Sequence, residues 1–264
     1  MPPTHSVIVP AYKEAGNLDA LTRRVFAACE NQGFAKGTVE IIIVDDNSRD
    51  GSVEVIDKLR KEGYNVTIIV RTTERGLSSA VLHGFKVANG QNLLCMDADL
   101  QHPPEAVPSL LRCFDNTSTE FVLGTRYGKG VEIDKDWPVH RRIISWGARI
   151  LARPLTSLSD PMSGFFGLRK DVLGKGLKVI SPIGYKVALE IFVKCQIKSY
   201  EEVAFNFAPR TIGESKLTGK VIVHYLKHLR MLYDFSFGTM FYVAIALLVI
   251  IAFYVLHKVL AHIL

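Results

Sequence analysis

The amino-acid sequence predicts an α/β protein with a mostly parallel sheet and one hydrophobic helix near its C-terminal end. Short runs rich in β-branched residues alternate with helical segments over the first hundred residues. This alternation is typical of parallel strands joined by right-handed crossovers. Acidic turns follow two of the predicted strands, and turns at strand ends face the ligand-binding edge of such a sheet. No internal repeat or low-complexity linker interrupts the pattern, so one main domain is expected.

The first four strands are predicted from short apolar runs, which are typical of a sheet that is buried on both faces. These runs are Ser6–Val9, Val39–Val44, Val66–Val70 and Asn92–Met96. The helices predicted between them are Asn17–Asn31, Ser52–Lys61 and Ser78–Val87. Asp50-Gly51 marks the start of the second helix, and Gly90 marks the end of the third.

The alternation becomes less regular after residue 100. Further strands are expected at Glu120–Gly124, Gly164–Leu168 and Glu201–Phe207. Further helices are expected from Pro103 to about Cys113 and over Arg141–Leu155, Tyr185–Gln196 and Gly219–Phe235. Two glycine-containing or charged stretches are predicted to be loops, Arg126–Pro138 and Arg210–Gly219.

The composition separates a basic globular part from an uncharged tail. Hydrophobic residues make up 48% of the chain and its mean hydropathy is +0.18, which is high for a soluble enzyme. The excess lies in Phe237–Leu256, which reads FGTMFYVAIALLVIIAFYVL. An apolar helix of about 20 residues matches the hydrocarbon core of a bilayer. We therefore expect a globular domain over residues 1–218, an amphipathic helix over 219–235, a membrane anchor over 236–258 and a short tail over 259–264.

The distribution of charge predicts how such an anchor would be oriented. The formal net charge is +6, and Lys220, Lys227 and Arg230 lie just before the uncharged segment, whereas only Lys258 and two histidines follow it. Positive charge is enriched on the cytosolic side of membrane helices. The N-terminal stretch MPPTHSVIVP lacks the basic and then apolar regions of a signal segment. A cytosolic domain with a single C-terminal anchor is the expectation.

Several motifs that define common enzyme classes do not occur in the sequence. GxGxxG, GxxxxGK[ST], GxSxG and HExxH are missing, which argues against a dinucleotide-binding enzyme, a P-loop enzyme, an α/β-hydrolase and a zinc protease. The four cysteines show no CxxC spacing, and we expect reduced packing residues at Cys29, Cys95, Cys113 and Cys195.

The strongest chemical signal is the segment LLCMDADLQHP, in which Asp97 and Asp99 follow an apolar strand. Side chains at the carboxyl end of a parallel strand face the ligand edge. Two carboxylates there are suited to a hard divalent cation that bridges a diphosphate. Such a cation would neutralise the charge that develops on a phosphate leaving group.

Two further strand ends carry polar residues. In the segment VDDNSRDG, Asn47, Ser48 and Asp50 are suited to cap a turn, while Asp46 is expected to accept hydrogen bonds from a nucleobase or ribose. In the segment VPAYKEAGNL, Tyr12 and Glu14 supply a ring and a carboxylate to the same edge. Parallel strands bring all three motifs together.

Together the segments VIVPAYKEAGNL, IIIVDDNSRDGS and MDADLQHPPE resemble the family 2 glycosyltransferases with the GT-A fold, in order and in spacing. Downstream, the segments LGTRY, WPVHRRIIS and SDPMSGFF are similar to the dolichyl-phosphate mannose synthases, a branch of that family. The resemblance covers roughly residues 6–236. It implies a GT-A, Rossmann-like sheet flanked by helices, with interface helices and one transmembrane helix.

The resemblance also implies an activity and its partners. The expected reaction is inverting transfer of mannose from GDP-mannose to dolichyl phosphate, with Mg²⁺ or Mn²⁺ as cofactor. The product, dolichyl β-D-mannosyl phosphate, serves glycosylation, mannosylation and GPI-anchor synthesis. The expected location is the cytosolic face of the endoplasmic reticulum membrane, with membrane lipid as a partner, no nucleic acid, and accessory membrane subunits possible without being required.

Roles follow from the resemblance at matching positions. The guanosine half of the donor would contact Pro10, Tyr12, Glu14, Val44 and Asp46. The metal and diphosphate would lie among Asp97, Ala98, Asp99 and Gln101, with Asp99 and Gln101 as the most direct metal ligands beside Asp97. Phosphate and sugar would face Arg126 and Arg141, and the nucleotide would be covered by Arg210 and Lys216. Asp99, Arg126 and Arg141 would thus carry the reaction, while the sequence leaves open which of Arg141 and Arg142 points inward.

The excess of basic residues in the chain suits the chemistry of this reaction. A lipid phosphate is already ionised near pH 7, so the reaction needs positive charge near its phosphates rather than a strong base.

The segment Arg141–Leu155 is amphipathic at helical period, which suits either a helix at the membrane surface or ordinary packing on the sheet. The alternatives for function are another polyprenyl-phosphate glycosyltransferase, such as a dolichyl-phosphate glucose synthase, and an inactive tail-anchored regulatory subunit.

Overall fold

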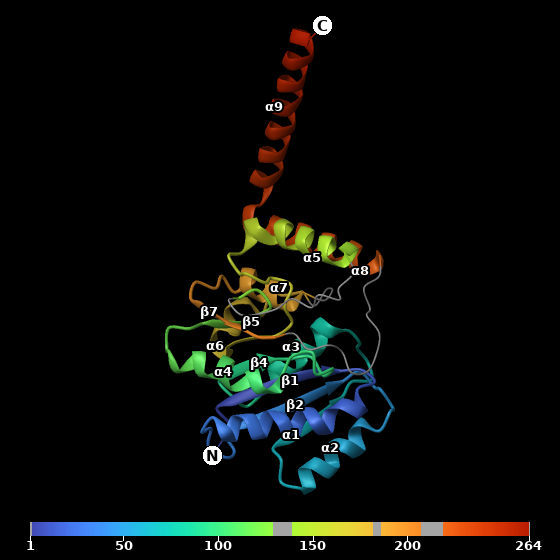
Figure 1. Cartoon of the computed structure of the whole chain (residues 1–264), viewed down its shortest axis with the longest axis vertical. Coiled ribbons are helices and arrows are strands. Elements are labelled where there is room, and N and C mark those ends of the chain that lie inside the picture. Colours follow the sequence, from blue (N-terminus) through green and yellow to red (C-terminus); the bar gives the residue numbers. More distant parts are fainter. Residues whose placement is uncertain (1, 129–138, 182–185, 207–218, 264) are drawn as a thin grey trace.

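The computed structural model describes residues 2–128, 139–181, 186–206 and 219–263. Within these residues, seven strands form one sheet in the order β3-β2-β1-β4-β6-β5-β7 (Figure 1). The strands are β1 His5–Ala11, β2 Val39–Asp45, β3 Val66–Val70, β4 Asn92–Cys95, β5 Phe121–Thr125, β6 Phe166–Arg169 and β7 Tyr200–Ala204.

All of these strands except β6 run in the same direction. β1 pairs in parallel with β2 and β4, β2 with β3, and β5 with β7, whereas β6 is antiparallel to both β4 and β5. The predicted mostly parallel sheet is therefore confirmed. The carboxyl ends of the parallel strands share one edge, and the amino end of β6 lies at that same edge because β6 is reversed.

Helices cover both faces of the sheet (Figure 1). One face is covered by α1 Ala15–Asn31, α2 Ser52–Lys61 and α4 Val107–Arg112. The other face is covered by α3 Leu77–Val87, α6 Lys170–Gly176 and α7 Val187–Lys194. Short 3₁₀ turns add η1 Pro104–Ala106, η2 Cys113–Asp115 and η3 Arg153–Leu155.

The alternation of side chains along β1 divides the core between the two faces. Val7 and Val9 pack with the α1 side, whereas Ile8 packs with the α3 side, and all three are fully buried. Gly84 allows α3 to approach the sheet closely, because a Cβ atom there would lie 2.5 Å from Cγ2 of Ile8. Burial on both faces explains why the predicted strands are continuous apolar runs.

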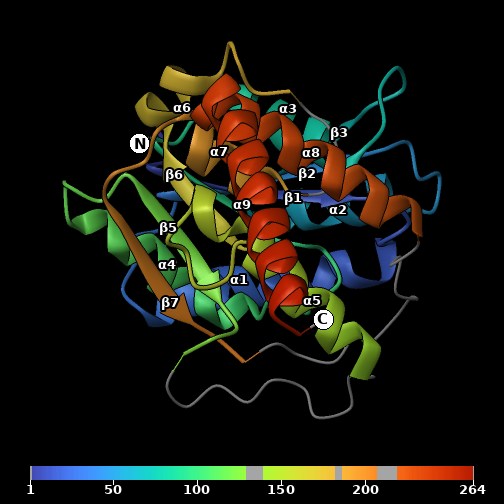
Figure 2. The same cartoon turned by 90° about the horizontal axis from the view of Figure 1, so that it is seen from above.

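Two further helices, α5 Val139–Ala152 and α8 Gly219–Phe237, lie side by side on the α7 side of the domain (Figures 1 and 2). The hydroxyl of Tyr225 on α8 donates to the carbonyl of Ala148 on α5 at 2.7 Å. A small apolar cluster joins α5, α7 and α8 through Ala152, Leu189, Val193, Leu229 and Leu232. The helix pair is thus packed onto the domain.

The last helix, α9 Thr239–Ile263, projects away from the rest of the molecule (Figure 1). It is separated from α8 by Gly238, whose φ of +55° is readily adopted by glycine. Among the described residues, no single helix has the length and apolar character of a membrane span, whereas Val221–Phe237 and Thr239–Tyr254 meet that criterion only as a pair bent by 105°. The predicted single span over residues 236–258 is therefore not confirmed, because the helix is broken at Gly238.

The strands and helices predicted for the first hundred residues are all present, with bounds shifted by at most two residues. The second half also follows the prediction, apart from α6, which the sequence analysis did not propose. The predicted loop Arg210–Gly219 lies outside the described residues except for its last position, and only residues 126–128 of the loop Arg126–Pro138 are described.

Candidate active site

The predicted motifs meet at the carboxyl edge of the sheet, in turns that follow the strands β1, β2 and β4. Several non-glycine residues of these turns have a left-handed backbone: Lys13 (φ +62°), Asn47 (φ +58°), Arg49 (φ +51°) and Leu100 (φ +61°). Such conformations are uncommon outside glycine and cluster at functional sites. The edge therefore combines polar side chains with backbone held in unusual geometry.

The turn after β2 is held by Asp45 and Asp50. Of the residues predicted to cap it, Ser48 and Asp50 take part in its hydrogen bonds, whereas α2 begins after Gly51 without a side-chain cap. The backbone N–H of Ser48 donates to Asp45 at 2.8 Å, and its hydroxyl also contacts that carboxylate. The N–H and hydroxyl of Ser52 donate to Asp50 at 3.1 Å and 2.6 Å. The turn after β1 joins this network, since Lys13 N–H donates to the Ser48 hydroxyl at 2.7 Å. The two loops thus form one unit.

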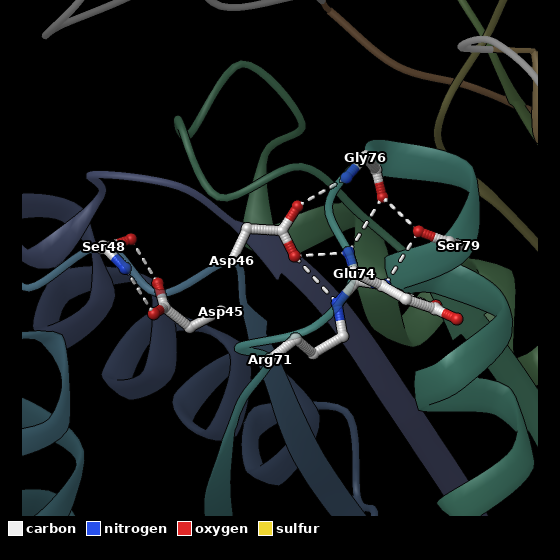
Figure 3. A network of polar contacts seen from close by, with 7 residues as sticks. All are labelled: Asp45, Asp46, Ser48, Arg71, Glu74, Gly76 and Ser79. Atoms are coloured by element: carbon white, nitrogen blue, oxygen red, sulfur yellow. Dashed lines mark hydrogen bonds and ion pairs between the residues drawn. The ribbon is translucent and has the colours of Figure 1, made fainter.

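Asp46 is held by the turn that follows β3, as Figure 3 shows. Its Oδ1 accepts hydrogen bonds from the Arg71 guanidinium, with Nε at 2.8 Å, and its Oδ2 accepts one from Gly76 N–H at 2.8 Å. Arg71 also donates to the Ser79 hydroxyl at 2.8 Å and to the Gly76 carbonyl at 3.0 Å. Both oxygens of Asp46 accept hydrogen bonds from the chain, which orders this edge, and the predicted contact of Asp46 with the ligand stays a prediction.

Tyr12 is the exposed ring of the predicted nucleotide side. Tyr12 is 39% exposed, and two cations lie over its ring, with Lys13 Nζ 5.6 Å and the Arg75 guanidinium carbon 5.7 Å from the ring centroid. Glu14 directly precedes α1 and accepts a hydrogen bond from Asn17 at 2.7 Å. The arrangement places an aromatic surface and positive charge together at the edge.

Three predicted binding residues, Pro10, Val44 and Ala98, are buried at this edge. Pro10 lies within β1 next to Val44 in β2, and both are buried. The Val44 side chain packs toward α3, since a Cβ atom on Gly84 would lie 3.1 Å from it. Ala98 is 3% exposed and belongs to the core on the α1 side.

The predicted metal segment begins with Asp97, whose side chain is 41% exposed. Gly164 lies beside it, and a Cβ atom there would come within 3.6 Å of both carboxylate oxygens. A glycine at this point leaves room next to the carboxylate. Asp99 is 7% exposed, and its Oδ1 accepts a hydrogen bond from Gln101 N–H at 3.2 Å across the left-handed Leu100.

The residues of this segment fit a hard divalent cation. Two carboxylates and an amide supply oxygen ligands, which Mg²⁺ and Mn²⁺ prefer. Among the described residues, no three His, Cys, Asp or Glu side chains form a ready-made metal cluster. This agrees with the usual binding of Mg²⁺ through one or two carboxylates together with substrate phosphates.

His102 supports Asp97 from inside the domain and was not selected by the sequence analysis. Its Nδ1 accepts a hydrogen bond from Asp97 N–H at 2.9 Å. The ring stacks on Phe165 at a centroid distance of 4.9 Å and meets Phe205 edge-on at 5.7 Å. Burial lowers the pKa of His102, although Asp97 acts in the opposite direction. A neutral imidazole therefore fixes the backbone that carries Asp97.

Arg126 follows β5 and forms a two-point ion pair with Asp160. Its Nε lies 2.7 Å from Oδ2 of Asp160, and its Nη2 lies 3.0 Å from Oδ1. Asp160 is fully buried, and Arg126 has a side-chain exposure of 15%. Thr125 and Ser159 hydroxyls share a further hydrogen bond of 2.7 Å. The predicted phosphate-facing arginine is thus held at the edge by a carboxylate that the motif segment SDPMSGFF provides.

The structure brings together Tyr12, Glu14, Asp46, Asp97, Asp99, Gln101 and Arg126 at one edge of the sheet. The side chains of Arg141 and Arg142, and the whole of Arg210 and Lys216, lie outside the described part of the chain. Five further residues at this edge were not predicted from the sequence: Arg71, Arg75, His102, Asp160 and Lys186. His102 and Asp160 stand inside quoted motifs, so their position beside predicted residues was an available signal.

Ligands of open α/β sheets bind at the carboxyl ends of the strands, and the acidic turns of this sheet lie at that edge, as in nucleotide-binding α/β enzymes. The family model described as "Glycosyl transferase family 2" matches residues 6–177. A dolichol-phosphate mannosyltransferase from Mycosarcoma maydis is 58% identical over 98% of this chain and 89% of its own length. One from Saccharomyces cerevisiae is 57% identical over 89% of this chain and 88% of its own length. The chain belongs to glycosyltransferase family 2, and it is a glycosyltransferase.

Solved structures support the same fold. Glucosyl-3-phosphoglycerate synthase from Mycobacterium tuberculosis, in complex with Mn²⁺, UDP and glucosyl-3-phosphoglycerate, has a TM-score of 0.60 at 17% identity and covers 89% of this chain and 80% of that one. A mannosyltransferase from Pyrobaculum calidifontis, in complex with GDP-Man and Mn²⁺, has a TM-score of 0.53 at 17% identity and covers 78% of this chain and 55% of that one. The GT-A-like fold expected from the resemblance is confirmed.

Proposed function

We propose that the protein transfers mannose from GDP-mannose to dolichyl phosphate and releases GDP. The observation that carries this proposal is the sequence identity of 57–58% with two proteins named dolichol-phosphate mannosyltransferase. The matches cover nearly the whole length of this chain and of each relative. The site adds the acidic turn of Asp97 and Asp99 at the edge where a nucleotide diphosphate would lie. The chain also keeps every residue of the motif DADLQ.

The donor is held by groups at the strand ends in this proposal. The exposed ring of Tyr12 and its neighbouring cations, Lys13 and Arg75, offer a stacking surface and positive charge for a nucleotide. Asp97, Asp99 and Gln101 would hold Mg²⁺ or Mn²⁺ beside the diphosphate. When bound, such a cation neutralises charge on the departing phosphate. Arg126 supplies a further cation at the same edge.

The reaction is a single displacement with inversion. A phosphate oxygen of the lipid forms a bond to the anomeric carbon while the bond between that carbon and the β-phosphate oxygen of GDP-mannose breaks. The bonding electrons leave with GDP. A phosphate monoester is largely a dianion above about pH 6, so no protein base has to remove a proton. What the residues contribute is position and positive charge.

The acceptor has a long hydrocarbon chain, and the molecule exposes apolar surface that suits a membrane. On α5, Trp146 is 62% exposed, and Ile150 and Leu151 are each 46% exposed. Along α9 the exposed apolar side chains include Met240, Leu248, Ile250, Phe253 and Tyr254. We propose that α9 anchors the chain and that α5 and α8 lie at the lipid surface. The proposed location is the cytosolic face of the endoplasmic reticulum membrane.

A donor assay on the purified full-length chain tests this function. Dolichyl phosphate in vesicles is offered with labelled GDP-mannose or labelled UDP-glucose, with EDTA and with Mg²⁺ or Mn²⁺ restored. We expect label to enter lipid only from GDP-mannose, to stop with EDTA and to return with metal. Transfer from UDP-glucose alone would identify a glucose synthase. No transfer from either donor would identify an inactive subunit.

A matched pair of variants tests the metal site. Asp97→Asn should lower the transfer rate about 100-fold, because a neutral amide offsets less of the cation's charge and binds it less firmly. Asp115→Asn, an exposed aspartate in η2, is the control and should keep the wild-type rate. Restored activity of Asp97→Asn at high Mn²⁺ would support a metal role. A wild-type rate for Asp97→Asn at limiting metal would contradict it.

A further inference from the structure

Lys186 is a charged side chain at the site that the predicted motifs do not include. It stands directly before α7, and its Nζ donates a hydrogen bond to the carbonyl of Met162 at 3.0 Å. The charged groups that act on it are Arg126, Asp160 and Asp97. A lysine from the α7 side therefore reaches the same carboxyl edge as the residues that follow β4 and β5.

The Met162 carbonyl that Lys186 contacts belongs to the turn from Asp160 to Gly164. Each end of this turn lies next to a residue of the candidate active site. At one end, Asp160 holds Arg126 through two hydrogen bonds of 2.7 Å and 3.0 Å. At the other end, Gly164 lies beside the carboxylate of Asp97. The turn closes on itself through Ser163 N–H, which donates to the Asp160 carbonyl at 3.0 Å. Lys186 thus binds the middle of a segment that holds Arg126 at one end and borders the carboxylate of Asp97 at the other.

The surroundings of Lys186 make its charge sensitive to pH. Burial lowers its pKa to about 8 and Arg126 acts in the same direction, while Asp160 and Asp97 oppose the shift. An ordinary lysine has a pKa near 10.4. The ammonium is therefore charged below about pH 8 and neutral above it. Holding a partly buried charge opposes folding, so its presence at this point calls for a role in the site.

We propose that Lys186 is a positioning residue for the transfer reaction, whose ammonium fixes the turn from Asp160 to Gly164 and so keeps Arg126 in place and the space beside Asp97 open for phosphate-bearing substrates. This inference rests on the proposed function and adds a residue to its site. Because Lys186 acts through the turn, its loss changes the reaction without removing any group that binds the substrate directly.

The test uses the full-length chain in vesicles and three variants. Lys186→Met removes the charge and keeps much of the volume, whereas Lys186→Arg keeps both a charge and a donor at all accessible pH values. Lys170→Met is the matched control, since Lys170 Nζ donates to the Ala88 carbonyl at 2.5 Å at the start of α6, away from the carboxyl edge. Transfer from GDP-mannose is measured between pH 6.5 and 9.5, and thermal unfolding confirms that each variant is folded.

The wild type should lose activity as pH rises through about 8, because the ammonium then loses its proton. Lys186→Arg should keep its activity to higher pH, and Lys186→Met should be slower by about tenfold at pH 7 with no loss near pH 8. Lys170→Met should follow the wild type. The proposal is overturned if Lys186→Met transfers at a rate within about twofold of the wild type at pH 7, or if Lys186→Arg shows the same alkaline loss.

A binding measurement separates this proposal from the proposed function. If the wild-type chain transfers no mannose, the proposed function fails on its own. Calorimetric titration of GDP with Mn²⁺ then tests Lys186 without turnover, because the turn holds Arg126 and borders the space beside Asp97. Lys186→Met should bind about tenfold more weakly than the wild type. Equal affinity in the two proteins would overturn the role of Lys186.

Discussion

Buried charges at the carboxyl edge are paired with charges from distant parts of the chain. The side chains of Arg71 and Asp46 are 4% and 12% exposed, and those of Arg126 and Asp160 are 15% and 0% exposed. Removing one member of such a pair leaves the other buried without compensation, which is strongly destabilising. These pairs therefore couple the stability of the fold to the geometry of the site.

The pair of Arg71 and Asp46 gives a prediction for stability. Arg71→Met should lower the free energy of unfolding by about 3 kcal/mol, because Asp46 keeps its charge and loses its main partner. Arg24→Met is the control, since Arg24 and Glu105 form an exposed ion pair of 2.8 Å. Its loss should cost less than about 1 kcal/mol. Urea unfolding of the two variants measures both values, and equal costs would show that burial does not matter here.

The pair of Arg126 and Asp160 gives a prediction for activity. Asp160→Asn keeps the shape of the side chain and removes the charge that holds the guanidinium, so transfer should slow by about 100-fold. The exposed pair of Asp19 and Arg23 supplies the control Asp19→Asn, which should leave the rate unchanged. Steady-state transfer rates with GDP-mannose measure the effect of each of the two variants. A normal rate for Asp160→Asn would show that the position of Arg126 is not needed.

The residues that lie at strand ends were predictable, and their partners were not. Apolar runs followed by acidic or aromatic residues marked Tyr12, Asp46, Asp97 and Asp99 in the sequence. Arg71 binds a carboxylate 25 positions earlier in the chain, and its pairing depends on how β2 and β3 are placed. Pattern along the chain carries no information about such pairings, because they are set by the register of the sheet.

At the scale of elements, buried polar contacts attach α8 to α7. Oε1 of Glu190 accepts hydrogen bonds from Lys194 Nζ at 2.6 Å and from Ser181 N–H at 2.7 Å. Its Oε2 lies 3.3 Å from Nε2 of His228 on α8. Burial tends to raise the pKa of Glu190, but His228, Lys194 and Ser181 outweigh it and hold this pKa below its ordinary value.

This network predicts a dependence of stability on pH. A carboxyl group whose pKa is lowered by folding stabilises the fold fully above its unfolded pKa, here 4.5, and that contribution is lost as pH falls through the folded value. The wild type should therefore lose more stability than Glu190→Gln between pH 7 and pH 4. Unfolding temperatures at both pH values test this. An equal loss in the two proteins would exclude Glu190 as the group concerned.

The exposed face of α5 predicts a preference for long acceptors. Replacing Ile144, Ile150 and Leu151 together with serine should slow transfer to long dolichyl phosphate more than transfer to a short soluble analogue, because only the long chain requires the lipid surface. Val53 and Val87 are exposed to a similar extent on α2 and α3, and serine at both positions serves as the control. Equal losses for long and short acceptors would argue against a lipid-facing α5.

Two features of the elements escaped prediction for local reasons. The helix α6 reads KDVLGKG, and its two glycines and short length weaken any helical signal. The break at Gly238 falls within a run that has no charged residue and is mostly apolar, and this run was therefore predicted as one span, although a glycine is a common helix end. By contrast, the long periodic helices and the buried strands of the first hundred residues were predictable because their pattern extends over many positions.

At the scale of the whole molecule, α9 is exposed over its described length and stands apart from the domain. If it enters a bilayer, two charges near its middle should be very unfavourable, by about 3 kcal/mol each. Leu248→Lys with Ile251→Lys should therefore move the chain from the alkali-resistant membrane fraction to the soluble fraction. Lys227→Gln with Arg230→Gln on α8 should leave it in the membrane. Retention of the double lysine variant would contradict the anchor.

The reversed strand β6 also shapes the molecule as a whole. Gly124 N–H donates to the Phe165 carbonyl at 2.7 Å, so the chain leaves the sheet after β5 and returns to it before β6 at neighbouring positions. The segment between these two points runs outside the sheet, and its two ends are held next to each other. Its length and apolar content can change without moving β1, β2 or β4. Such an arrangement lets the segment between β5 and β6 vary, in evolution or by design, while the strand ends that carry Tyr12, Asp46 and Asp97 stay as they are.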